Sequence, residues 1–118
     1  MAKKTCAILQ PHYLPWIGYF EMIDRVDIFV FLDDVQFIKR EWKNRNRIRK
    51  TPDHADSKWL TVPIRREDQH GPLNQAHLFN DEDWVTTHLN AIRGSYHRAP
   101  YFECFFPALE ATMGKYSN

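Results

Sequence analysis

The apolar positions near the start of the chain fall into three short blocks. Residues 5–9 are mostly apolar and Pro11 follows them, which predicts a short buried strand, because proline cannot donate to a sheet ladder. The apolar side chains of residues 18–25 recur at helical spacing, so a helix is expected there. Residues 28–32, IFVFL, are apolar throughout, as in a strand buried on both faces. This order predicts a βαβ unit with two parallel strands.

The rest of the chain predicts three more elements. Pro63 ends the strand pattern of WLTVPI, and Asp83 is a suitable N-cap for a helix that Gly94 and Ser95 should break. The expected elements are a strand over 59–64, a helix from Trp84 to about Gly94, and an amphipathic helix over 101–113. Together these patterns predict one α/β domain over residues 1–118, built on a small, mainly parallel sheet flanked by helices.

The composition is that of an ordinary globular protein. With 118 residues, 43% hydrophobic and 26% charged, the chain can bury a core, and a disordered class is excluded. Cys6 and Cys104 lie far apart, so no disulfide framework is indicated and two buried thiols are expected. No stretch has the length of a membrane span or a signal-peptide core. We therefore expect a cytoplasmic protein that does not enter a membrane.

An aromatic loop, residues 10–18 (QPHYLPWIG), joins the first strand to the helix. Ordinary loops are small and polar, whereas this loop is rich in aromatic residues and is stiffened by Pro11 and Pro15. Gly18 lets a backbone or a ligand approach closely. One interpretation is that the aromatic side chains close the end of the core. The other is that the loop binds a ligand through hydrogen-bonding and stacking side chains, namely Gln10, His12, Tyr13 and Trp16.

Two carboxylates, Asp33 and Asp34, directly follow the second strand. Ligands bind at the carboxyl ends of strands in open α/β sheets, so we expect the aromatic loop to face these carboxylates at one edge. Adjacent strand residues point to opposite faces, which makes them a poor shared-proton pair. Asp33 or Asp34 is therefore a candidate catalytic residue that orients an acceptor or binds a metal such as magnesium. Capping of a turn is the alternative role.

The histidines do not predict a zinc site. The six histidines include no HExxH or other close-set ligand pair, and no GxSxG, Walker or GxGxxG motif is present. His12 alone lies in the aromatic loop. A hydrogen-bonding role and a general-base role are both open for it.

The basic segment, residues 38–50 (IKREWKNRNRIRK), contains seven basic side chains and a single acidic one, Glu41, which cannot balance them. If the segment were helical, Lys39, Lys43 and Arg47 would share a face. A solvated face is the simplest interpretation, but like charges at this density repel one another, so we expect an anionic partner. It could be a nucleotide-sugar, another nucleotide diphosphate or a nucleic-acid backbone. The candidate binding residues in and beside this segment are Gln36, Lys39, Arg40, Trp42, Asn44 and Arg45.

Three stretches, QPHYLPWIGYF, DIFVFLDDVQFIKREWKNRNRI and WLTVPI, resemble the WbqC-like protein family in this order, and WVTTHLNAI and YHRAPYFE resemble its next segments. The resemblance implies that the chain corresponds to the N-terminal part of a longer protein. The positions that match the family's motifs are Gln10, Pro11, Tyr13, Pro15, Gly18, Tyr19, Asp33, Asp34, Gln36, Lys39, Trp42, Asn44, Arg45 and Asn46.

The resemblance also implies a function. WbqC-like proteins are associated with bacterial surface polysaccharide and O-antigen gene clusters, so a transferase acting on a phosphate-bearing or nucleotide-activated substrate is expected. Relatives in phage pathways imply an alternative, the transfer of an amino acid to modified DNA bases. A third hypothesis is a non-enzymatic module that binds nucleic acid or a partner protein. The sequence leaves the oligomeric state open.

Overall fold

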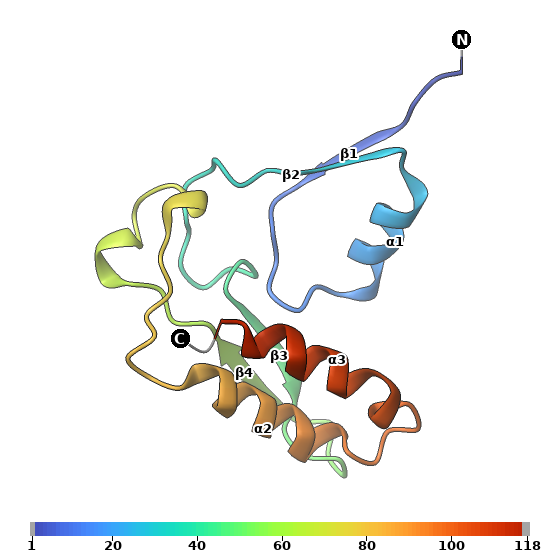
Figure 1. The fold of residues 1–118 in the computed structure, drawn as a ribbon, viewed down its shortest axis with the longest axis vertical. Helices are drawn as coiled ribbons and strands as arrows, with labels where there is room; N and C mark the ends of the chain where they lie inside the picture. The colour runs from blue at the N-terminus through green and yellow to red at the C-terminus, as the bar shows by residue number, and fades with distance from the viewer. Residues whose placement is uncertain (1, 117–118) are drawn as a thin grey trace. The chain divides into compact units, whose positions relative to one another are not determined.

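Residues 2–116 are described by a computed structural model, which Figure 1 draws as a ribbon. They divide into two compact units. Unit 1 comprises the described residues through Asn46 together with Ile64–Leu78. Unit 2 comprises Arg47–Pro63 together with the described residues from Phe79 onward. Within residues 2–116, no helix is long and apolar enough to cross a membrane.

Unit 1 begins with the βαβ unit that the apolar blocks predict. β1 (Cys6–Leu9) and β2 (Ile28–Phe31) pair in parallel, side by side in Figure 1, and α1 (Ile17–Arg25) connects them. The α/β class is therefore confirmed. Leu32 N donates a hydrogen bond to Leu9 O at 2.8 Å just beyond the paired residues. The segments that follow the two strands thus leave the same edge, as expected.

Both strands of this pair are more exposed than the sequence predicts. Ile8 in β1 is 57% exposed and Phe31 in β2 is 55% exposed, so the expectation of burial on both faces is wrong. The ring of Phe29 in β2 packs near that of Tyr19 in α1, with 5.7 Å between centroids. A parallel sheet is buried on both faces only when layers cover both of them. In the described part of unit 1, α1 supplies one such layer.

The segment Ile64–Leu78 is tied to the rest of unit 1 through main-chain hydrogen bonds. Leu73 N donates to Val35 O at 2.7 Å, within a short run of such contacts that follows β2. Two short 3-10 helices interrupt the segment, η1 (Arg66–Asp68) and η2 (Leu73–Gln75).

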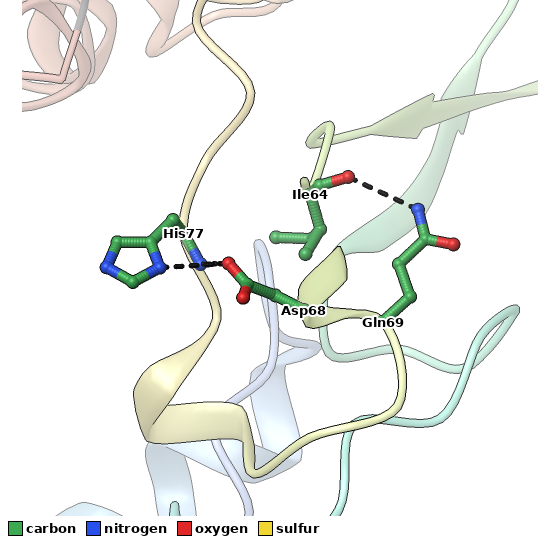
Figure 2. A network of polar contacts seen from close by, with 4 residues as sticks. All are labelled: Ile64, Asp68, Gln69 and His77. Atoms are coloured by element: carbon green, nitrogen blue, oxygen red, sulfur yellow. Dashed lines mark hydrogen bonds and ion pairs between the residues drawn. The ribbon is translucent and has the colours of Figure 1, made fainter. Parts of the chain in front are cut away.

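A carboxylate closes this segment into a loop, as Figure 2 shows. Asp68 Oδ2 accepts hydrogen bonds from the main-chain nitrogen and from Nδ1 of His77, each at 2.9 Å. Gln69 Nε2 donates to Ile64 O at 3.2 Å. The hydrogen bonds from His77 lower the pKa of Asp68 below its ordinary value. The Asp68 carboxylate therefore stabilises the folded state at a pH above its unfolded-state pKa, and this stabilisation is lost as the pH falls through its folded-state pKa.

Unit 2 combines a β-hairpin with two helices. β3 (Arg45–Arg49) and β4 (Ser57–Thr61) form an antiparallel pair. The first two residues of β3, Arg45 and Asn46, are counted with unit 1. α2 (Trp84–Tyr96) and α3 (Phe102–Gly114) run side by side in Figure 1. The buried apolar side chains come from all four elements and include Ile48, Leu60, Val85, Leu89, Ile92, Phe106 and Met113.

The basic segment is not a helix, so the shared basic face that a helix would give does not form. Residues 39–44 form turns and bends, and the chain then extends as β3. Side chains alternate across a strand, so Ile48 is buried while Arg47 and Arg49 on either side of it are exposed. The predicted third strand is present as β4, which ends before Pro63 rather than at residue 64.

Both predicted helices of unit 2 are confirmed, although α2 is longer than expected. Asp83 caps α2 by accepting a hydrogen bond from Thr86 N at 3.1 Å. Hydrogen bonding from the side chain of Thr86, and then from its main chain, lowers the pKa of Asp83. α2 continues through Gly94 because Ser95 is buried and its hydroxyl donates to Arg49 O at 2.6 Å. A contact with a distant strand therefore overrides the local breaking signal.

The expectation of two buried thiols is wrong. Cys6 and Cys104 are both free and exposed. Cys6 lies on β1, where Ile8 is exposed as well, and Cys104 lies two residues before the buried Phe106 of α3. Residues two apart on a helix do not share a face, so burial of Phe106 leaves Cys104 in solvent.

We expect Leu60→Ala to lower the free energy of unfolding by about 2–5 kcal/mol, because the truncation leaves a cavity in the core. Leu60 is only 5% exposed. The matched control is Phe105→Ala on α3, where the side chain is 71% exposed and the change should stay within about 0.5 kcal/mol. Denaturant unfolding followed by circular dichroism measures both variants. Equal effects would contradict the assignment of Leu60 to the core of unit 2.

Candidate ligand-binding site

Unit 1 contains a cavity of about 310 Å³ at the aromatic loop, which is near the lower end of the size range for small-molecule sites. Two indoles form part of the wall, Trp16 with 67% of its surface exposed and Trp42 with 44% exposed. The side chains that line the cavity are His12, Pro15, Trp16, Trp42 and Asn46. The aromatic loop therefore meets the turn that leads into β3.

The aromatic loop is held by main-chain and side-chain hydrogen bonds to that turn. Tyr13 N donates to Trp42 O at 3.0 Å. The side-chain amide of Asn46 donates to Tyr13 O at 3.2 Å and to Leu14 O at 2.7 Å. Leu14 has a φ of 45°, in the left-handed region that a leucine rarely adopts. The Asn46 contacts therefore stabilise a strained loop conformation, a feature that clusters at functional sites.

Trp16 explains the glycine at position 18. A Cβ atom on Gly18 would lie 2.1 Å from the Cη2 and Cζ3 atoms of the Trp16 indole. Any larger residue would therefore push the indole away from the first turn of α1. The sequence indicated that a backbone or a ligand could approach Gly18, whereas the group that approaches it is the side chain of Trp16.

His12 presents an uncharged imidazole to the cavity near neutral pH. Burial lowers the pKa of His12, the nearby Lys43 ammonium lowers it further, and Glu41 opposes the shift. The His12 ring lies 5.3 Å from the ring of Tyr19, measured between centroids. The neutral ring can donate one hydrogen bond and accept another.

Lys43 is a buried positive charge rather than part of a solvated face. Its side chain is 1% exposed, and Nζ forms an ion pair with Glu41 Oε2 at 2.5 Å. Glu41 is 47% exposed, so the pair reaches solvent through its acidic partner. An ammonium removed from water is strongly destabilising without such a partner. The ion pair holds the Lys43 ammonium near His12, where its positive charge disfavours protonation of the imidazole.

The turn before Trp42 carries two exposed cations. Lys39 and Arg40 are both exposed there, and Arg40 has a φ of 65°. Arg45 Nη2 donates to Arg40 O at 2.5 Å, so the Arg45 side chain stabilises the turn. The predicted binding residue Arg45 thus has a contact within the protein, whereas the side chains of Lys39 and Arg40 extend from the surface.

Residues 10–118 match the WbqC-like protein family. The chain belongs to this family. A relative from Mycobacterium tuberculosis strain H37Rv, with the name Uncharacterized protein Rv1507c, is 37% identical over 99 residues, which are 84% of this chain. Those residues are 42% of the relative, so the chain spans less than half of its length. No solved structure matches the chain.

The WbqC-like fold brings together only part of the predicted site. His12, Trp16 and Trp42 line one cavity. Asp33 and Asp34 are exposed after β2, and among the described residues they are not part of that lining. The aromatic loop therefore meets the basic turn, residues 39–44, at the cavity, while the two carboxylates lie outside the cavity wall.

Other predicted binding residues contribute through the main chain or lie beside the cavity lining. Gln10 O accepts a hydrogen bond from Tyr19 Oη at 2.8 Å. Gln36 forms a β-bridge with Pro72, and its side chain is exposed. Asn44 is half-buried in the turn before β3. These three residues lie outside the cavity lining, and the contacts of Gln10 and Gln36 are with other parts of unit 1.

Two important residues of this site were missing from the predicted binding set. From the sequence, Asn46 was noted as an amide of the basic segment and as a motif position of the WbqC-like family, and Lys43 as one of the charges of that segment, but neither was assigned to the binding set. Their roles depend on contacts with the aromatic loop, which lies about 30 residues earlier in the chain. Among residues 2–116, no group of three or more His, Cys, Asp or Glu side chains is placed to hold a metal ion.

We expect Asn46→Ala to lower the free energy of unfolding by about 1–3 kcal/mol, because it leaves two carbonyl oxygens without their donor. Amide hydrogen exchange at Tyr13 should also become faster, since its bond to Trp42 O depends on the same loop conformation. Asn74→Ala, at an exposed asparagine, is the control and should do neither. Unchanged exchange at Tyr13 in Asn46→Ala would disprove the anchoring role.

We expect Lys43→Met to raise the pKa of His12, because it removes the like charge that disfavours protonation. The pKa should stay below that of free histidine, since burial is the larger cause and remains. Folded-state protonation is disfavoured, so the wild type should lose stability as the pH falls below about 6.5. NMR titration of the His12 ring measures the shift. Lys39→Met should leave the pKa of His12 unchanged. An equal shift in both variants would contradict the assignment of Lys43 as a cause of the lowered pKa.

Proposed function

We propose that the cavity of unit 1 binds the ring of a phosphate-bearing or nucleotide-activated substrate and that the chain contributes this site to a transferase. The observation that carries the proposal is the pair of indoles, Trp16 and Trp42, on the wall of one cavity. Aromatic faces stack on bases and on the apolar faces of sugars. His12 and Asn46 add hydrogen-bonding groups to the same wall.

The phosphate of this substrate would bind to the basic turn. Lys39 and Arg40 are exposed within three residues of Trp42, so one short turn offers both stacking and charge. A guanidinium binds phosphate through two parallel hydrogen bonds, and an ammonium acts as a point charge. The hydrogen bond from Arg45 to Arg40 O supports the backbone from which these side chains extend.

We assign the catalytic step to Asp33 or Asp34. Both carboxylates are exposed at the carboxyl edge of the parallel pair. Asn74 N donates to Asp33 O at 2.8 Å, which fixes the backbone there. A carboxylate at this edge can accept the proton of an acceptor hydroxyl, or it can bind magnesium together with substrate phosphate. Surface polysaccharide synthesis is the proposed setting, because its sugar donors are nucleotide-activated.

We expect Trp42→Ala to weaken the binding of a nucleotide-sugar roughly 5- to 150-fold, because loss of one stacking face costs about 1–3 kcal/mol. Trp42→Phe keeps an aromatic face and should retain most of the affinity. Isothermal titration calorimetry gives the Kd, with nucleoside monophosphates and nucleotide-sugars as ligands. The same ligands should raise the melting temperature of the wild type, because they bind the native state.

The control for this experiment is Phe105→Ala, which removes an exposed aromatic ring in unit 2 and should leave the Kd unchanged. Two results would contradict the proposal. One is a folded wild type whose melting temperature no nucleotide or nucleotide-sugar raises. The other is a Trp42→Ala variant that binds the ligand as tightly as the wild type.

A further inference from the structure

The hairpin of unit 2 has one basic and aromatic face. In β3, Arg47 and Arg49 are exposed, and Ile48 between them is 8% exposed. In β4, Trp59 is 44% exposed, and its neighbour Leu60 is 5% exposed. Because side chains alternate across a strand, the buried positions face the core and the three exposed side chains lie on the opposite face.

Arg47 and Trp59 contact each other on this face. The guanidinium carbon of Arg47 lies over the Trp59 ring, 5.2 Å from its centroid. Such a cation–π contact orients the arginine and keeps its charge at the surface. Arg49 N donates to Tyr96 Oη at 3.0 Å, and the guanidinium Nε of Arg49 donates to His54 O at 3.4 Å. Neither β3 nor β4 contains an acidic residue.

We infer that this face of the hairpin binds single-stranded nucleic acid. Trp59 is 44% exposed and offers a base the part of its indole that Arg47 does not cover, and Arg47 and Arg49 offer charges for the phosphates beside that base. Alternate residues of a strand are about 6.6–6.8 Å apart. Successive phosphates of an extended single strand have a comparable separation, so the two arginines can follow the backbone.

Single-stranded nucleic acid fits this face better than other anions do. In a duplex, each base is already stacked on its neighbours, so Trp59 would have no base face to contact. A single small anion would use one arginine and leave the indole without a role. The inference concerns residues outside the cavity of unit 1, so it does not depend on the function proposed for that cavity.

The experiment measures fluorescence anisotropy of a labelled oligothymidine of about 12 nucleotides, a length within the range for one binding surface. We expect salt-dependent binding that Trp59→Ala weakens roughly 5- to 150-fold, as loss of a stacked base would. Trp59→Phe should retain most of the affinity. Arg47→Gln and Arg49→Gln should each reduce the slope of log K against log salt by about 0.7, the value for one phosphate contact on a single strand.

The controls separate this face from general charge and from general aromatic exposure. Arg66→Gln removes one exposed charge in η1, and Phe105→Ala removes one exposed ring in α3; both should bind like the wild type. Circular dichroism checks that every variant is folded. The inference is overturned if folded wild type fails to bind at low salt or if the hairpin variants bind like the controls. It is also overturned if a duplex of equal length shows the same dependence on Trp59.

Discussion

The side-chain amide of Asn46 is the contact on which the geometry of the candidate site depends. It donates to two successive carbonyl oxygens in a loop that lies 33 residues earlier, and one of them belongs to Leu14 at a φ of 45°. Without these donors, a leucine would leave the left-handed region, because its side chain disfavours that conformation. His12 and Trp16 flank the strained segment, so their placement on the cavity wall follows from the same anchor.

One basic run serves several physical roles because the chain changes conformation within it. Lys43 is buried in an ion pair with Glu41 and biases the charge of His12. Arg45 braces the turn through a main-chain oxygen. Arg47 and Arg49 then follow strand alternation and lie on the exposed face of the hairpin. A charge count over the run cannot separate these roles, since each depends on whether a given residue lies in the turn or in the strand.

The parts of the fold that follow from local pattern were predictable from the sequence. The βαβ order of unit 1, the Asp83 cap and the helix that contains Phe106 are all present. The failures have a common cause in contacts between distant residues. Ser95 continues α2 by donating to Arg49 O, and Ile8 is exposed because, in the described part of unit 1, the layer that α1 supplies does not cover it. In the site, the aromatic loop itself was predicted, whereas its anchor and its buried lysine were not, because both need the folded chain to bring them there.

Three local features of the site each oppose stability, and all of them lie around one cavity. Leu14 adopts a conformation that leucine avoids, and Gly18 weakens the first turn of α1 by about 1 kcal/mol relative to alanine. Lys43 is desolvated beside His12. Natural proteins break local rules at functional sites, and contacts elsewhere in the fold supply the stability that is lost there. Gly18 is the clearest case. Alanine at this position would stabilise the helix, but its Cβ atom would displace the Trp16 indole from the position it holds beside the cavity.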